Sequence, residues 1–231
     1  MSVTANYVIN EPYPQRDNVY YGMMEGIISR PVLWNSENPY LYTLVMKLTD
    51  KSGKVVDARS TKIGIRDIRI DGNRILVNET PIKLIGVNRH DHSETGGKTV
   101  TRQEMLEDVL LLKRYNFNTV RTSHYPNDPY FYDLCDKYGI YVMDEANLET
   151  HHQKGYLANR PEWSTPYMER AVRMVVRDRN HPLCLCGRLA MNRDVDQIML
   201  PCPDGLKIMT LLAPYIMKEH REYPDIHFIN Q

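Results

Sequence analysis

The segment NTVRTSHYPNDPYFYDLCDKYGIYVMDEAN, residues 118–147, decides the fold class. It opens with a short strand pattern at 119–122 and closes with another at 140–143. Between them, residues 128–138 predict a helix that stops at Gly139, because glycine readily adopts the left-handed conformation that ends many helices. A strand, a helix and a second strand in series predict parallel strands joined by a crossover helix.

The same alternation continues on both sides of this segment. Residues 82–87 predict an earlier strand, residues 101–115 a helix that starts with a capping box, and residues 165–179 a further helix. A doubly wound sheet would alternate in the same way, but no glycine-rich phosphate loop follows the first strand, which favours a barrel. A whole (β/α)₈ TIM barrel needs about 250 residues. We therefore expect residues 67–182 to form the first half of one.

The region before the barrel pattern is antiparallel in character. Two β-rich runs, 41–48 and 55–63, flank an Asp/Ser/Gly turn and predict a hairpin. A second short pair, 68–70 and 75–77, flanks another turn. Together they predict a small antiparallel module of the kind found in β-sandwiches.

Composition excludes several classes of protein. The 231 residues carry 29 Lys+Arg and 29 Asp+Glu, so no basic excess favours nucleic acid or an anionic membrane as a partner. No run of about 18 apolar residues predicts a membrane span, and the first residues lack a signal-peptide pattern, so we expect a cytoplasmic protein. The four cysteines lack the spacing of a disulfide framework or a zinc site and are expected to be reduced.

Polar residues gather where the predicted parallel strands end. His90, His124 and His151 lie at or just beyond the ends of three successive strands, the edge that carries the active site in TIM barrels. A lone histidine is more often structural, but three in equivalent positions favour a functional site. Glu149 and His151 are one residue apart, so an extended chain could direct both at one hard cation; a solvated loop explains this spacing equally well.

These residues belong to segments that resemble a known family. The resemblance rests on GVNRHDH (86–92), NTVRTSHYPN (118–127), LCDKYGIYV (134–142), DEANLETH (144–151) and, upstream, NPYLY (38–42). The second and third are similar to the first signature of glycoside hydrolase family 2. The element Glu149-x-His151 resembles β-galactosidases and is absent from β-glucuronidases. The resemblance covers about residues 30–182.

The resemblance implies an α/β fold: the N-terminal part of a TIM barrel at 67–182, preceded by a partial immunoglobulin-like β-sandwich at 1–66. It implies hydrolysis of terminal β-D-galactosides of the lactose type with retention of configuration. His90 and His124 would bind the substrate, and Arg121 would position neighbouring carboxylates.

The resemblance also implies a metal cofactor and an assembly. Glu149 and His151 would bind Mg²⁺. The resemblance is also compatible with a full-length parent enzyme that binds Na⁺ in addition and forms a homo-oligomer.

The pattern breaks after Pro182. The family has its acid/base glutamate next, in a Trp-Ser-Leu-Gly-Asn-Glu-Ser segment, but residues 183–193 read LCLCGRLAMNR. If the third base of each codon starts the frame, Met191-Asn192 must encode glutamate, and the neighbouring codons permit the rest of that segment. In the same shifted frame, the codon pairs 209–210 and 217–218 must also encode acidic residues. Their distances from the glutamate match the spacing of acidic residues in the family.

We therefore expect a frameshift near Pro182. Residues 183–231 would be an out-of-frame tail that does not form the fourth strand. No catalytic pair would be intact, because the acid/base glutamate is expected at Met191 and Asn192 and the nucleophile is absent. Two alternatives stay open: a pseudoenzyme that binds galactosides without turnover, and a related β-glucuronidase, which Glu149-x-His151 disfavours.

Overall fold

The computed structural model describes residues 28–149, 156–157 and 160–189, together with three short strands: β1 (Val8–Ile9), β2 (Tyr21–Gly22) and β12 (Ile226–Ile229). Its contacts divide the chain into two units, 1–32 and 33–231. In the first unit, β1 and β2 pair antiparallel. All other elements described below belong to the second unit.

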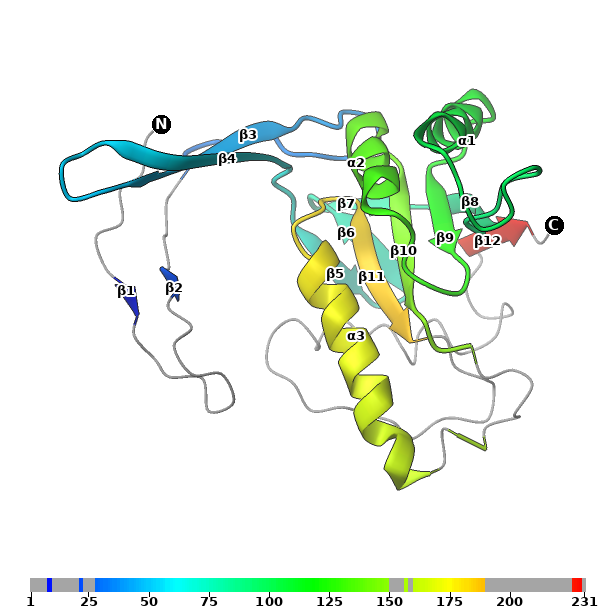
Figure 1. Ribbon diagram of the computed structural model, residues 1–231. Helices are drawn as coiled ribbons and strands as arrows, with labels where there is room; N and C mark the ends of the chain where they lie inside the picture. Colours follow the sequence, from blue (N-terminus) through cyan, green and yellow to red (C-terminus); the bar gives the residue numbers. More distant parts are fainter. Residues whose placement is uncertain are drawn as a thin grey trace. The chain divides into compact units, whose positions relative to one another are not determined.

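A five-stranded sheet forms the centre of the second unit (Figure 1). Its strands lie in the order β11–β10–β9–β8–β12, and every neighbouring pair is parallel. The four main strands are β8 (Leu84–Arg89), β9 (Thr119–Thr122), β10 (Tyr141–Ala146) and β11 (Cys184–Leu189). The parallel pairing predicted from the alternating pattern is confirmed.

Three helices connect these strands: α1 (Arg102–Arg114), α2 (Pro129–Tyr138) and α3 (Ser164–Asp178), the last entered through the 3₁₀ turn η2 (Pro161–Trp163). At α1 the Thr101 side chain accepts from the backbone N–H of Glu104, whose carboxylate in turn accepts from the Thr101 backbone N–H. Gly139 ends α2 in the left-handed conformation, with φ of 71°. The predicted helices and their end signals are confirmed.

The core lies between the sheet and the helices. Val120 and Val142 of the sheet and Val109 and Phe131 of the helices are completely buried there. Trp34, also buried, packs edge-on against the Tyr141 ring and donates from its indole N–H to the Asp136 carbonyl oxygen. These contacts hold α1 and α2 on one face of the sheet, which leaves its other face for the site.

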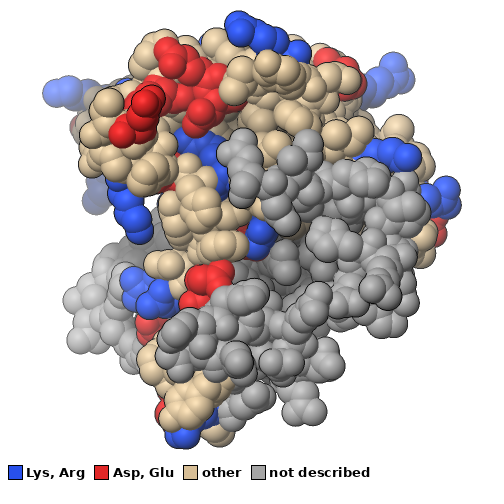
Figure 2. Space-filling view, turned by 90° about the vertical axis from the view of Figure 1, so that its right-hand side faces the viewer, with Lys and Arg blue, Asp and Glu red and all other residues tan. Residues whose placement is uncertain are grey.

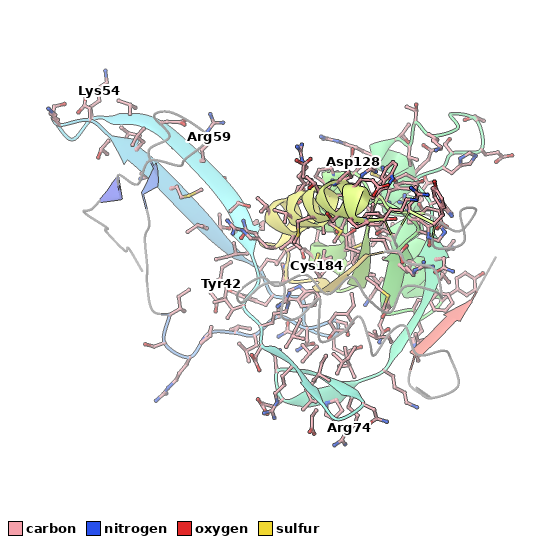
Figure 3. The ribbon with its side chains drawn as sticks, turned by 90° about the horizontal axis from the view of Figure 1, so that it is seen from below. Tyr42, Lys54, Arg59, Arg74, Asp128 and Cys184 are labelled. Atoms are coloured by element: carbon pink, nitrogen blue, oxygen red, sulfur yellow. The ribbon has the colours of Figure 1, made fainter. Side chains whose placement is uncertain are left out.

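Two antiparallel sheets precede the parallel one. Strands β3 (Tyr42–Thr49) and β4 (Val55–Ile63) form the predicted hairpin, while β5 (Ile68–Asp71), β6 (Arg74–Val77) and β7 (Thr80–Ile82) form a separate three-stranded sheet. Figure 3 shows Lys54 at the tip of the first hairpin and Arg74 near the turn of the second.

The single strand predicted at residues 82–87 is wrong. Ile82 ends β7, where it pairs with Ile75 of β6, and Leu84 begins β8 in the parallel sheet. The chain changes sheets at Lys83, whose carbonyl oxygen accepts from the Asn118 side chain. The two strands merge in the sequence because no glycine, proline or other turn signal separates Ile82 from Leu84.

The expectation that residues from 183 onward would not form a fourth strand is wrong for Cys184–Leu189. This segment is β11, and it pairs with β10 from Val142↔Cys184 to Ala146↔Leu189. After α3 a short turn brings the chain to the edge of β10, and Leu183 is buried there. Backbone groups at that edge pair with any chain in an extended conformation, so the ladder needs no particular side chains.

The described surface carries charges of both signs. Figure 2 shows basic and acidic side chains on the same face, in line with the equal numbers of each in the sequence. No helix within the described ranges is long and apolar enough to cross a membrane. Cys135 and Cys184, the latter at the start of β11 (Figure 3), are free thiols, as expected.

Candidate active site

The pleat of the strands sends polar side chains to opposite faces of the parallel sheet. Successive residues on a strand alternate between the two faces. Asn88 and Arg121 are cross-strand partners, and Glu145 is two residues beyond Met143, which is also paired with Arg121. Asn88, Arg121 and Glu145 therefore share one face.

The other face of the same strands looks toward the helices. Arg89 donates from Nε to Asp108 of α1 over 2.9 Å. Asp144 accepts from the Tyr132 hydroxyl of α2 over 2.7 Å and from the Thr122 hydroxyl over 3.0 Å. The helix-facing polar groups thus serve packing between layers.

Glu145 is a fully buried charged group on the site face. It is 0% exposed. Arg121 donates from Nε to Glu145 Oε1 over 2.7 Å and from a terminal nitrogen to Asn88 Oδ1 over 3.1 Å. A buried carboxylate of this kind is tolerated only with a close cationic partner, which Arg121 provides.

His124 follows β9 and meets three charged groups at one ring nitrogen. Its Nδ1 lies 3.0 Å from Glu145 Oε2, 3.2 Å from a terminal nitrogen of Arg121 and 3.3 Å from Glu149 Oε2. His90, at the end of β8, places its ring edge-on to His124 with 5.5 Å between ring centroids. Burial, together with the nearby His124 and Arg121, lowers the pKa of His90, so its imidazole is neutral at pH 7.

These side chains line an open pocket of about 510 Å³ at the carboxyl ends of β8, β9 and β10. Its lining residues are His90, His92, Lys98, His124, Tyr125, Asn147 and Glu149. The structure thus brings together His90, His124 and Glu149, three of the residues selected from the sequence. Arg121 lines a neighbouring pocket that shares both of these histidines.

Other selected residues lie outside the described part of the chain: His151, Met191 and Asn192. Of the two predicted metal ligands, the structure therefore shows Glu149. Its carboxylate lines the pocket beside Asn147 and is 43% exposed, so it can offer a hard oxygen donor of the type that Mg²⁺ prefers.

A different group of metal-type side chains, Asp133, Asp136 and His181, lies among the described residues away from the pocket. Asp136 accepts from His181 Nδ1 over 2.5 Å and from the Leu183 backbone N–H over 3.2 Å. Both of its carboxylate oxygens are therefore used to join α2 to the start of β11. The arrangement serves a structural role.

Glu145 was overlooked in the sequence, although the segment that contains it was recognised. The sequence offered only the alternation of Tyr141, Met143 and Glu145 along one strand. The pairing of Met143 with Arg121 was needed to place Glu145 on the same face as Arg121.

Comparison with known proteins now decides the family. Residues 68–190 match the model described as "Glycosyl hydrolases family 2, TIM barrel domain", and residues 4–66 match the model described as "Glycosyl hydrolases family 2". The chain belongs to glycoside hydrolase family 2. The family's TIM-barrel domain thus begins within this sequence, as the alternating pattern predicted.

Family 2 relatives with high similarity are named as β-galactosidases. The enzyme from Alteromonas mediterranea is 45% identical over 168 residues, and that from Psychromonas ingrahamii is 44% identical over 177 residues. These alignments cover 72% and 76% of this chain but only 16% and 17% of the relatives. The chain therefore spans a small part of the length of these enzymes.

Among solved structures of the family, a β-glucuronidase from Ruminococcus gnavus in complex with uronic deoxynojirimycin matches with a TM-score of 0.65 and 31% identity. That match covers 73% of this chain and 29% of the other. The complex of the same enzyme with D-glucuronic acid gives a TM-score of 0.62 over 73% of this chain.

Proposed function

We propose that this protein is a segment of a retaining β-galactosidase and that its pocket binds the galactosyl group of terminal β-D-galactosides. The observation that carries the proposal is the convergence of His90 and His124, 5.5 Å apart, on a pocket that Glu149 also lines. Imidazoles that donate and accept hydrogen bonds suit the hydroxyl groups of a neutral sugar.

The pairing of Arg121 favours a neutral sugar over a uronic acid. The Arg121 guanidinium is directed at Glu145, so the carboxylate of a glucuronide would meet a guanidinium that is already paired. Glu149 and Lys98, which carry opposite charges, both line the pocket. The β-galactosidase names of the sequence relatives support the same choice over the β-glucuronidase names of the structural ones.

The pocket is proposed to bind without turning substrate over. Retention requires two carboxyl groups about 5–5.5 Å apart, one acting as acid/base and one as nucleophile. Glu145 is unsuited to either role because it is buried and both of its oxygens are engaged, by Arg121 and by His124. Glu149 is proposed as a magnesium ligand together with His151. The bound ion would supply positive charge near the sugar hydroxyls.

Replacement of His124 with alanine is expected to weaken galactoside binding about 5- to 150-fold, because loss of one hydrogen-bonding partner costs about 1–3 kcal/mol. The measurement is an NMR titration of the full chain with methyl β-D-galactoside in the presence of Mg²⁺. Lys54→Ala, at the tip of the β3–β4 hairpin (Figure 3), is the control and should bind as the parent chain does. Tighter binding of methyl β-D-glucuronide would instead support the β-glucuronidase alternative, and a folded chain that binds neither sugar would refute the proposal.

The nucleotide sequence is expected to encode the absent acid/base segment one frame away. Codons 186–193, translated from the third base of each codon, should give Trp-Ser-Leu-Gly-Asn-Glu-Ser, with the glutamate across Met191 and Asn192. Sequencing of the gene across codons 180–195 tests this. Codons 118–147 translated in the same shifted frame are the control and should give no family segment. A stop codon or an unrelated translation across 186–193 would rule out the frameshift.

A further inference from the structure

We propose that Glu145 is a positioning residue whose carboxylate keeps the His124 proton on Nδ1 and so presents Nε2 to the pocket as a hydrogen-bond acceptor. The use of Nε2 by a sugar hydroxyl rests on the proposed function. The position of the proton follows from the contacts within this chain alone.

The first support is the depth and rigidity of Glu145. Its side chain is completely buried at the end of β10, where the strand is still paired with β11. Oε1 accepts from Arg121 Nε over 2.7 Å, and Oε2 lies 3.0 Å from His124 Nδ1. One carboxylate therefore orients two side chains from the neighbouring strand, one through each oxygen.

The second support is the balance of charges around His124 Nδ1. With the proton on Nδ1, the ring donates to Glu145 Oε2, and Glu149 Oε2 lies close by at 3.3 Å. With the proton on Nε2, the Nδ1 lone pair would face both carboxylates and gain only a contact with Arg121 at 3.2 Å. In the Nδ1–H form Arg121 cannot donate to His124, but it keeps its hydrogen bonds to Glu145 and Asn88. The buried Glu145 carboxylate is the nearer of the two and accepts from Nδ1–H, and this outweighs a contact with a guanidinium that is already shared.

The chemical consequence concerns which groups the pocket accepts. The His124 side chain is 32% exposed and lines the pocket, and Nδ1 is taken up by Glu145, so Nε2 is the ring nitrogen left to meet a ligand. In the Nδ1–H tautomer Nε2 has a lone pair and no proton. A ligand must then donate a hydrogen bond at this point, as an alcohol does and a methyl ether does not.

The test is the tautomeric state of His124 in the full chain labelled with ¹⁵N-histidine, read from the Nδ1 and Nε2 chemical shifts above pH 8, where an ordinary imidazole is neutral. The parent chain should show Nδ1–H. In Glu145→Gln the ratio of Nδ1–H to Nε2–H should fall at least about tenfold, because a charge-assisted hydrogen bond is lost.

Glu149→Gln is the matched control, because it makes the same change in a carboxylate near the same nitrogen. Glu149 is partly exposed and lies farther away, so the ratio should change less than about twofold. Nε2–H in the parent chain would overturn the proposal even if Glu145→Gln does not fold. So would a folded Glu145→Gln variant with an unchanged ratio.

Ligand binding separates this proposal from the proposed function. A parent chain that shows Nδ1–H but binds no galactoside would refute the proposed function and leave the role of Glu145 intact. If galactoside binds, a β-galactoside methylated at the hydroxyl next to His124 should lose affinity in the parent chain. Methyl ethers at each sugar position, tested in turn against the parent and His124→Ala, identify that hydroxyl. Equal tolerance of every ether by the parent chain would overturn the acceptor role.

Discussion

Replacing Arg121 with alanine is expected to lower the free energy of unfolding by about 3–5 kcal/mol, the usual cost of removing one partner of a buried ion pair. Glu145, which is 0% exposed at the end of β10, would lose its 2.7 Å contact from Arg121. Urea unfolding followed by tryptophan fluorescence measures the loss. Of the two tryptophans, Trp34 is buried and Trp163 is 40% exposed, so a Trp163→Phe background makes Trp34 the reporter.

A double variant identifies the cause of this loss. If the cost arises from an uncompensated buried charge, Glu145→Gln should restore a large part of the stability that Arg121→Ala removes. Losses that simply add in the double variant would mean that packing of the arginine, and not its charge, stabilises the site.

Asp144 is expected to make the protein less stable as pH rises from about 4 to 7. Burial, and then the neighbouring Asp178, raises the pKa of Asp144 to about 7. Its Oδ2 is buried without a hydrogen-bond partner, which also favours the neutral acid. Because the folded state keeps a proton that the unfolded chain releases near pH 4, this contribution is complete at low pH and is lost as pH rises through 7.

Asp144→Asn isolates this effect from other titrating groups. Burial raises the pKa of Asp136. Burial lowers the pKa of His181, but its hydrogen bond with Asp136 outweighs this and leaves the pKa raised. Both groups also reduce stability as pH rises, but they are present in parent and variant alike. The parent should lose up to about 4 kcal/mol more than the variant between pH 4 and pH 7, at about 1.4 kcal/mol per pH unit. Parallel stability profiles in urea titrations at each pH would contradict the assignment.

The parts of the fold that the sequence predicted are those with local causes. Thr101 and Glu104 cap α1 through bonds within one turn, and Gly139 ends α2 through its own backbone conformation. Strand β9 has the predicted bounds because its four residues are isolated between polar segments. In each case the deciding interaction lies within a few residues of the signal.

The missed parts depend on partners distant in the sequence. The change of sheet at Lys83 is visible only once Ile82 has paired with Ile75 and Leu84 has joined the parallel sheet. Strand β11 forms because β10 offers an edge, which no pattern within Cys184–Leu189 reveals. For the site, strand-end histidines could be selected from the sequence, but the contact of Glu145 with both Arg121 and His124 required the register between β9 and β10.

The alternation along β10 has an evolutionary consequence. Asp144 and Glu145 are neighbours in the chain, yet Asp144 faces the helices and Glu145 contacts Arg121 and His124 on the opposite face of the sheet. Substitutions can change either acid separately. Deletion or insertion of one residue within Tyr141–Ala146 would instead move the side chains of both acids to the opposite faces of the sheet. Descendants of this protein should therefore keep the length of the strand Tyr141–Ala146.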